Sequence, residues 1–209
     1  MQQQFRFKAS HLSILLAGVI VLVACGPATL APEDVQTASV HEVSVATQNS
    51  QSDATEAFET VMTVLTHPRC INCHPVADRP RQRDEQIFHI LNVTRGEDNH
   101  GGPVQTCETC HHEENNPYSL VPGAPHWGLA PKTMGWFGLT HAEIAERLLD
   151  PEMNGGRSHE DLIHHMGNDA LVLWAWDPGG DRTPIPVPHE EFVQALEEWL
   201  DAGAPIPGE

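Results

Sequence analysis

Apolar residues recur at helical spacing in two well-separated segments of the chain. In 54–66 and again in 189–202 they return every three or four positions, and most residues between them are polar. This periodicity predicts an amphipathic helix in each segment, with one face turned towards a core. The apolar positions are Phe58, Val61, Met62 and Leu65 in the first segment, and Phe192, Leu196 and Trp199 or Leu200 in the second.

Two further helices are predicted from their starts rather than from their apolar faces. Thr140 is followed three residues later by Glu143, and Ser158 by Asp161. A hydroxyl residue with an acidic residue at this spacing resembles a capping box, which opens a helix. The helices expected from these starts span 140–149 and 158–167.

The other segments carry weaker patterns. Residues 74–102 are rich in Arg, Asp and Pro, which predicts loop with one short helix at 84–91. A stretch rich in Pro, Gly and aromatic residues, 117–138, predicts a second loop. The apolar run 171–176 is expected to form a wall of the core. No long-strand pattern is found, so the sequence predicts a mainly α fold.

The N-terminus resembles a bacterial export signal. A short basic start precedes an apolar run from Leu12 to Val23, which is too short to span a bilayer comfortably. The four residues ending at Cys25 (Leu-Val-Ala-Cys) resemble a lipobox, in which the chain is cut before the cysteine and the cysteine is lipidated. Gly26 after it favours the outer membrane. We therefore expect a periplasmic lipoprotein, anchored to a membrane by lipid.

These signals divide the chain into three parts. We expect a lipoprotein signal peptide at 1–24, a disordered tether at 25–53 that begins with lipidated Cys25, and one globular domain at 54–209. The tether consists mainly of small and polar residues without a basic or aromatic side chain before residue 54, apart from one histidine, which is typical of a flexible segment. Such a tether has an average reach of about 30 Å.

The charge balance excludes several partners. The formal charge is −18, and removal of Arg6 and Lys8 with the signal peptide leaves nine basic residues against 29 acidic ones. Nucleic-acid binding needs a basic face, so nucleic acid is excluded as a partner. A protein partner is expected to present a basic or neutral surface.

Two Cys-x-x-Cys-His motifs carry the chemistry of the chain. This motif is the attachment signature of c-type haem: the two thiols bond to the haem vinyl groups, and the histidine becomes the proximal iron ligand. We therefore predict two covalently bound haem c groups. The predicted attachment residues are Cys70, Cys73 and His74 for the first haem, and Cys107, Cys110 and His111 for the second.

The alternative to haem is a zinc site made of the same four cysteines. Zinc sites of this kind usually have about 15–20 residues between the two pairs, whereas 33 separate Cys73 from Cys107. All five cysteines are accounted for by two haems and the lipid. Because Cys70 and Cys107 are only 37 positions apart, we expect the haems to share one core. The predicted fold is thus mainly α, with small cytochrome c-like helices and long loops packed around two covalent haems.

The ligand on the far side of each iron has several candidates. For the first haem we expect His89, with His100 and His112 as alternatives. For the second haem the choice lies between Met134 and His165. A Met ligand raises the reduction potential relative to two histidines.

Arginine side chains are expected to pair with the haem propionates, because a guanidinium group suits carboxylates. The candidates are Arg157, Arg69, Arg81 and Arg95.

Several short strings of residues in and beyond the two motifs are typical of one protein family. They are His67 to Pro75, Asn92-Val93 with Arg95-Gly96, Cys107 to His111, Gly123-Ala124-Pro125, Met134, Asp150-Pro151 with Asn154-Gly155-Gly156, and Leu171 to Trp174. Over about residues 60–205 the chain resembles the bacterial dihaem-type cytochromes often labelled isoquinoline 1-oxidoreductase subunits. The resemblance implies a cytochrome that accepts electrons from a periplasmic molybdenum hydroxylase or aldehyde dehydrogenase.

The sequence therefore predicts an electron carrier rather than an enzyme. In this interpretation electrons enter at one haem, pass to the other and leave for a downstream acceptor in the respiratory chain. Two alternatives require an open or displaceable position on one iron: a dihaem peroxidase-like enzyme and a haem-based sensor.

Overall fold

The computed structural model describes the backbone of residues 36–208 and the side chains from Ser50 onwards. The expected signal peptide, Cys25 and the first part of the expected tether lie outside the described residues. The helices are α1 (Gln36–Leu65), α2 (Pro68–Ile71), α3 (His141–Leu149), α4 (Pro151–Asn154), α5 (His159–Asn168), α6 (Ala170–Leu173) and α7 (His189–Asp201), with 3₁₀ turns η1 (Cys107–Thr109), η2 (Lys132–Met134) and η3 (Trp174–Trp176). The strands are β1 (Arg81–Gln82), β2 (Ile87–Phe88), β3 (Gly101–Gly102) and β4 (Gln105–Thr106). The fold is thus rich in helix, with a few short strands.

The first helix is much longer than the sequence predicted. We expected a helix from residue 54, whereas α1 begins at Gln36 and runs for 30 residues, about 45 Å at 1.5 Å per residue. α1 thus covers residues 36–53, where the sequence predicted a disordered tether. No proline or glycine lies between Pro32 and Pro68, so nothing in the backbone chemistry interrupts the helix.

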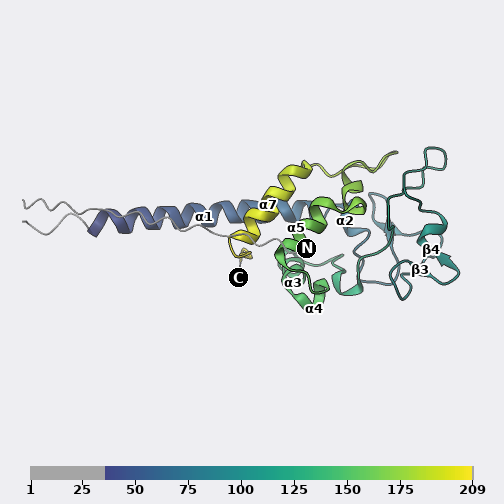
Figure 1. Ribbon diagram of the computed structural model, residues 1–209, viewed down its shortest axis with the longest axis horizontal. Coiled ribbons are helices and arrows are strands. Elements are labelled where there is room, and N and C mark those ends of the chain that lie inside the picture. The colour runs from purple at the N-terminus through teal and green to yellow at the C-terminus, as the bar shows by residue number, and fades with distance from the viewer. Residues whose placement is uncertain (1–35, 209) are drawn as a thin grey trace, which may run out of the picture.

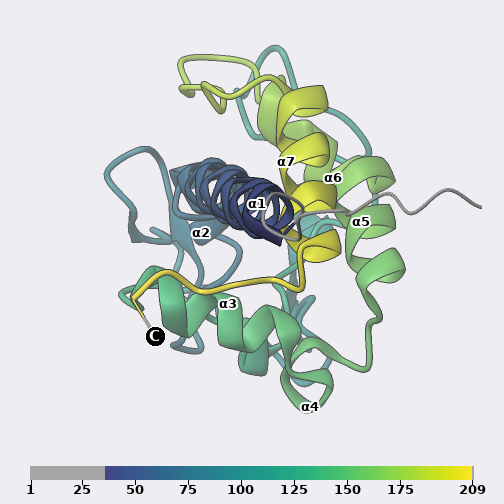
Figure 2. The same ribbon diagram turned by 90° about the vertical axis from the view of Figure 1, so that its left-hand side faces the viewer.

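The molecule has a helical part and a loop part at opposite ends of its long axis. α1 projects from the helical part, and the loops that carry β3 and β4 lie at the other end (Figure 1). A view along α1 shows α7, α5 and α6 beside it on one side and α3 and α4 on another (Figure 2). The C-terminal half of α1 is therefore the element around which the other helices pack.

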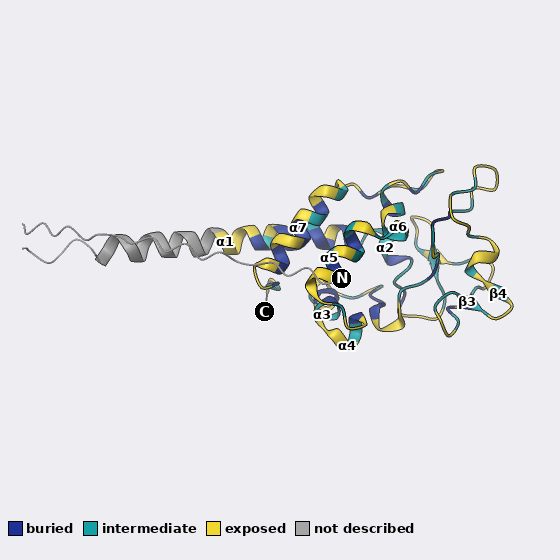
Figure 3. Cartoon of the chain, viewed as in Figure 1, coloured by how far each residue is buried: buried dark blue, intermediate teal, exposed yellow. Residues whose placement is uncertain are grey.

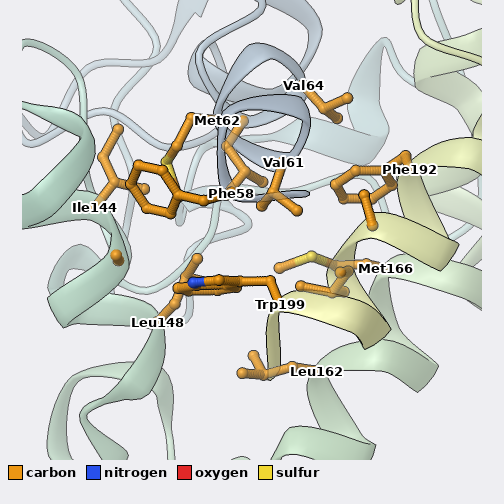
Figure 4. Packing of buried hydrophobic residues seen from close by; sticks show 14 of the residues in the cluster. Phe58, Val61, Met62, Val64, Ile144, Leu148, Leu162, Met166, Phe192 and Trp199 are labelled. Atoms are coloured by element: carbon orange, nitrogen blue, oxygen red, sulfur yellow. The ribbon is translucent and has the colours of Figure 1, made fainter. Parts of the chain in front are cut away.

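The core of the helical part is centred on Trp199 of α7. Its side chain is fully buried, and its ring centroid lies 5.7 Å from that of Phe58 in α1. Leu148 of α3 and Leu162 of α5 complete the layers around it (Figure 4). The buried apolar faces predicted for 54–66 and 189–202 are confirmed, and they pack against each other.

Both predicted capping boxes are present. The Thr140 hydroxyl accepts a hydrogen bond from the Glu143 backbone N–H, and the Glu143 carboxylate accepts one from the Thr140 N–H. Ser158 and Asp161 repeat this arrangement at the start of α5. The two helices therefore begin where the sequence predicted them to begin.

Two segments differ from the prediction. The expected short helix at 84–91 is wrong: β1 and β2 form a hairpin there, with Arg81 opposite Phe88 and its guanidinium group 4.6 Å from the Phe88 ring centre. Arg83 and Gln86 have left-handed backbone angles (φ of 64° and 54°), which a helix does not allow. The run 171–176 forms α6 and η3. Only Ala175 in this run is buried and most of the other residues are half-buried, so the run contributes less to the core than expected.

The loop part is far less buried than the helical part. Buried residues concentrate in α1, α3, α5 and α7, whereas the loops between residues 76 and 122 are mostly intermediate or exposed (Figure 3). None of the helices between residues 36 and 208 combines the length and the apolar character needed to cross a bilayer.

Replacing Trp199 by alanine tests the packing of the core. We expect Trp199→Ala to lower the free energy of unfolding by about 3–5 kcal/mol, because a large buried side chain leaves a cavity. Urea titration followed by circular dichroism measures the change. The matched control is Glu197→Ala, which alters an exposed position of the same helix and is expected to stay within about 0.5 kcal/mol of the parent. Equal losses in the two variants would contradict this description of the core.

Candidate haem sites

Each Cys-x-x-Cys-His motif forms a single tight turn. In the first motif the Cys73 N–H donates to the Cys70 carbonyl at 3.1 Å, and in the second the Cys110 N–H donates to the Cys107 carbonyl at 3.2 Å. The first turn continues α2, which His67 caps and Pro68 starts. The second turn is η1. The two motifs therefore share a local backbone geometry, with the histidine directly after the turn.

The two motif histidines are held in the same orientation. Nδ1 of His74 lies 2.7 Å from the carbonyl oxygen of Met134, and Nδ1 of His111 lies 2.7 Å from that of Pro122. Because a carbonyl oxygen only accepts hydrogen bonds, Nδ1 carries the proton in each ring and donates it. Nε2 is left as the nitrogen with a free lone pair. A backbone carbonyl on the other ring nitrogen is typical of metal-binding histidines.

A glycine follows each of these carbonyls and allows the close approach. A Cβ atom added to Gly135 would overlap the Pro75 carbonyl, directly after His74. One added to Gly123 would overlap the backbone oxygens of His112 and Glu114. Each motif histidine is thus positioned by a residue–glycine pair from a distant loop, packed against the backbone that follows the histidine.

A tryptophan stacks on the His74 ring and connects it to the core. The Trp136 ring is nearly parallel to the His74 ring, with 3.6 Å between the centroids. The Trp136 indole N–H donates to the carbonyl oxygen of Leu65, the last residue of α1, at 3.0 Å. The first motif is therefore supported directly by the helix that organises the fold.

The second motif has its own aromatic support, from a loop tryptophan and from the tryptophan that follows α6. Trp127 stacks on His111 with ring centroids 4.6 Å apart, and Trp174 meets Trp127 edge-on at 4.9 Å. Oδ1 of Asn115 accepts hydrogen bonds from the Trp174 indole N–H at 2.9 Å and from the Gly123 N–H at 3.1 Å. Through Trp174, which follows α6, this set of contacts connects the His111 ring to the helical part.

Burial keeps both motif histidines neutral. Removal from solvent lowers the pKa of His74 to about 3, and it also lowers the pKa of His111. The unprotonated imidazole is the form that binds metal. Burial raises the pKa of the Cys70 thiol to about 12 and that of Cys73 to about 11. Both cysteines are therefore thiols rather than thiolates at neutral pH.

The four motif cysteines are not gathered at one point in this structure. All four are free, with no disulfide among them. Zinc takes thiolate ligands arranged as a tetrahedron, and among residues whose side chains are described no three His, Cys, Asp or Glu side chains gather as metal ligands would.

A cavity of about 620 Å³ opens beside the second motif and reaches the first. This volume is in the range of small-molecule and cofactor sites. Apolar side chains on its rim are otherwise exposed to solvent: Ile90 by 66 %, Leu91 by 55 % and Leu120 by 57 %. The motif residues that line the cavity are Cys73, Cys107, Cys110 and His111, and they are joined by His89 and Trp174.

The residue types that line the cavity are those that a haem c would require. An apolar group bound there would cover the exposed apolar rim, and Cys107, Cys110 and His111 could supply the thioethers and the proximal ligand. Carboxylates of the group need cationic partners. Four of the eight arginines that follow the signal peptide line the cavity in this strongly acidic chain: Arg69, Arg81, Arg83 and Arg182.

Only some of the predicted arginine candidates lie at the cavity. Arg69 and Arg81 line it, although Arg69 also pairs with Asp84. Arg95 instead donates to the carbonyl oxygens of Pro75 and Ala130. It thereby connects the loop after the first motif to the segment that precedes η2. Arg157 donates to the carbonyl oxygen of Asn154 within a turn.

The candidates for the far-side ligands are distributed differently from the prediction. His89, expected at the first haem, lines the cavity of the second motif, with its ring centroid 6.1 Å from that of His111. His165, expected at the second haem, lies near His74, whose pKa it helps to lower. Its own Nδ1 is 3.3 Å from the Asp169 carboxylate.

The remaining candidates have other surroundings. Met134, expected at the second haem, is buried in the core and supplies its backbone oxygen to His74, so it lies at the first motif. Nδ1 of His100 is 3.2 Å from the Trp127 carbonyl oxygen, and His112 is exposed.

The sequence did not predict the carbonyl partners of the motif histidines. Met134 was considered only for its sulfur atom, and Pro122 was not considered. Every residue type has a backbone carbonyl oxygen, so residue type does not show which carbonyl accepts a hydrogen bond. The glycines that follow them, Gly123 and Gly135, were the available signal, because a glycine inside a loop often marks a close approach between backbones.

Comparisons with known proteins add nothing to this geometry. No protein-family model matches the chain, and neither the curated proteins nor the solved structures yield a match.

Alanine at either glycine tests the support of the motif histidines. We expect Gly135→Ala and Gly123→Ala each to lower the free energy of unfolding by about 1–3 kcal/mol, because the added Cβ overlaps backbone atoms that cannot move aside. Gly135 has a φ of −79°, which alanine adopts freely, so the loss at that position reports the overlap alone.

The matched control for both variants is Gly167→Ala. An added Cβ there meets only Val193 methyl groups, at 3.8 Å or more. Alanine is also the better helix former, so this variant is expected to match or exceed the parent. Chemical denaturation of all four proteins makes the comparison. Unchanged stability of the Gly135 and Gly123 variants would show that the carbonyl–histidine contacts are not tightly constrained.

Proposed function

We propose that the protein is a periplasmic electron-transfer protein that carries two covalently bound haem c groups. The observation that carries the proposal is the repeated geometry of the two motifs. In each, a neutral histidine donates through Nδ1 to a loop carbonyl, presents Nε2, and follows two free cysteines on one turn. When bound, haem supplies one-electron chemistry, and the chain's residues hold and orient it.

The closeness of the two motifs favours electron transfer over separate roles. Cys73 of the first motif and Cys107 of the second line the same cavity, and Cys107 contributes to raising the pKa of Cys73. Two haems attached at these thiols would lie side by side. In this proposal an electron enters at one haem, passes to the other and leaves for a downstream acceptor of the respiratory chain.

The charge of the protein indicates the kind of partner. The formal charge of −18 favours donors and acceptors with basic or neutral docking surfaces. Lys132, the one lysine after the signal peptide, pairs with Asp78 at 2.9 Å. The resemblance to isoquinoline 1-oxidoreductase subunits suggests a molybdenum hydroxylase or aldehyde dehydrogenase as the donor.

The proposed location is the periplasmic face of a membrane, with the outer membrane favoured. A lipid on Cys25 would anchor the chain. The globular domain would then be held away from the membrane by a helix over residues 36–53, which is a stiffer spacer than a disordered tether.

Counting haems tests the cofactor assignment. The full chain is to be produced in a bacterium with the cytochrome c maturation system, and haem measured as the pyridine haemochrome per chain. We expect two haems, and one in the double variant Cys107→Ser with Cys110→Ser. The matched control, Cys25→Ser, removes the predicted lipid site and is expected to keep both haems. Zinc without haem in the purified protein would contradict the proposal.

Reactions with small ligands separate an electron carrier from the two alternatives. We expect the reduced protein to pass electrons to a soluble redox acceptor and to consume hydrogen peroxide no faster than a simple cytochrome c does. Rapid peroxide turnover would instead indicate a peroxidase-like enzyme. Ready binding of carbon monoxide by the ferrous protein would indicate an open iron position and thus a sensor or an enzyme.

A further inference from the structure

We infer that His89 and His111 form an axial pair that binds one iron, so that the second haem has two histidine ligands and His89 belongs to it rather than to the first haem. The inference rests on the proposed function, because it requires haem at the second motif. It reverses the assignment that sequence spacing favoured for His89.

The separation of the two rings is the first reason. Their centroids are 6.1 Å apart, with the ring planes at 69°. A metal–imidazole bond is about 2.0 Å long, and the centre of a five-membered ring lies about 1.1 Å beyond the bonded nitrogen, given ring bonds of about 1.3–1.4 Å. Two imidazoles on opposite sides of one iron therefore have centroids about 6 Å apart, as these two rings do.

The position of His89 in the cavity is the second reason. Both histidines line the cavity that contains Cys107 and Cys110. The Nδ1 atom of His89 is buried and has no hydrogen-bond partner. Because Nδ1 has almost no accessible surface, an iron in the cavity would bind this ring through Nε2, which is not among the buried atoms without a partner and makes no hydrogen bond.

The backbone of His89 is held on both sides, which is the third reason. Its N–H donates to the Pro80 carbonyl at 3.0 Å, and its carbonyl accepts from the Arg79 guanidinium group at 2.9 Å. The residue directly follows the β1–β2 hairpin. The hairpin that replaces the expected helix therefore places His89 opposite His111.

The competing histidines lie outside the cavity lining. His89 and His111 line the cavity, whereas His100, His112 and His165 do not. His165 is paired with Asp169 and lies near the first motif. Of the candidates considered, His89 is the one whose ring faces His111 across a distance that suits an iron.

Spectroscopy of three glycine variants tests the pair. In the ferric protein, electron paramagnetic resonance and the proton resonances of the haem methyl groups distinguish the two haems. We expect His89→Gly and His111→Gly to alter the signals of the same haem, and His74→Gly to alter those of the other. His89→Gly should convert one of the two irons to high spin, with low-spin signal restored by added imidazole.

A matched control and a second variant complete the test. His100→Gly removes a neighbouring histidine and is expected to leave both low-spin signals in place. His89→Met tests the same position without opening it, and is expected to raise the reduction potential of one haem only. The inference is overturned if His89→Gly alters the His74 haem or alters neither.

Haem content separates failure of the inference from failure of the proposed function. Two haems per chain in the parent and in His89→Gly, with unchanged spectra, would reject His89 as a ligand and leave the cytochrome proposal standing. Absence of haem from the parent itself would reject both.

Discussion

The hydrogen bond from each motif histidine to a backbone carbonyl is the contact around which each candidate haem site is built. A histidine after a Cys-x-x-Cys turn has two ring nitrogens and free rotation, so the motif alone does not fix which nitrogen a metal would meet. The carbonyls of Met134 and Pro122, each 2.7 Å from Nδ1, decide this for His74 and His111. Most other features near the motifs hold those two carbonyls in place: a glycine after each one, a tryptophan stacked on each ring, and loops pinned by arginine and asparagine side chains.

The two sites obtain this support from different sources, which explains the two-part shape. The first motif continues from α1 and is held through Trp136, which connects its histidine to the end of that helix. The second motif is held by Trp127 and Asn115, which lie in loops, and by Trp174, which directly follows α6. A haem bound there would contribute apolar contacts that the loops themselves lack. We therefore expect the loop part to depend on its cofactor for stability more strongly than the helical part does.

The sequence predicted the helical part well because helices are encoded locally. Capping pairs and three-to-four-residue periodicity located α3, α5, α7 and the buried half of α1. The hairpin at 81–88 and the position of His89 were missed because they follow from a contact across strands, Arg81 with Phe88, and from left-handed residues other than glycine. His89 is nearer in sequence to His74, yet its ring lies 6.1 Å from that of His111. The Cys-x-x-Cys-His motifs can be identified from the sequence because their spacing is fixed, whereas the surroundings of the other histidines depend on how the loops fold.

A crystal structure of the mature protein with its cofactors tests the central claim most directly. Two irons are expected, one bound to Nε2 of His74 and one to Nε2 of His111, with each Nδ1 still donating to the carbonyl of Met134 or Pro122. An iron bound through Nδ1 of either histidine, or a motif histidine turned away from its carbonyl, would contradict it.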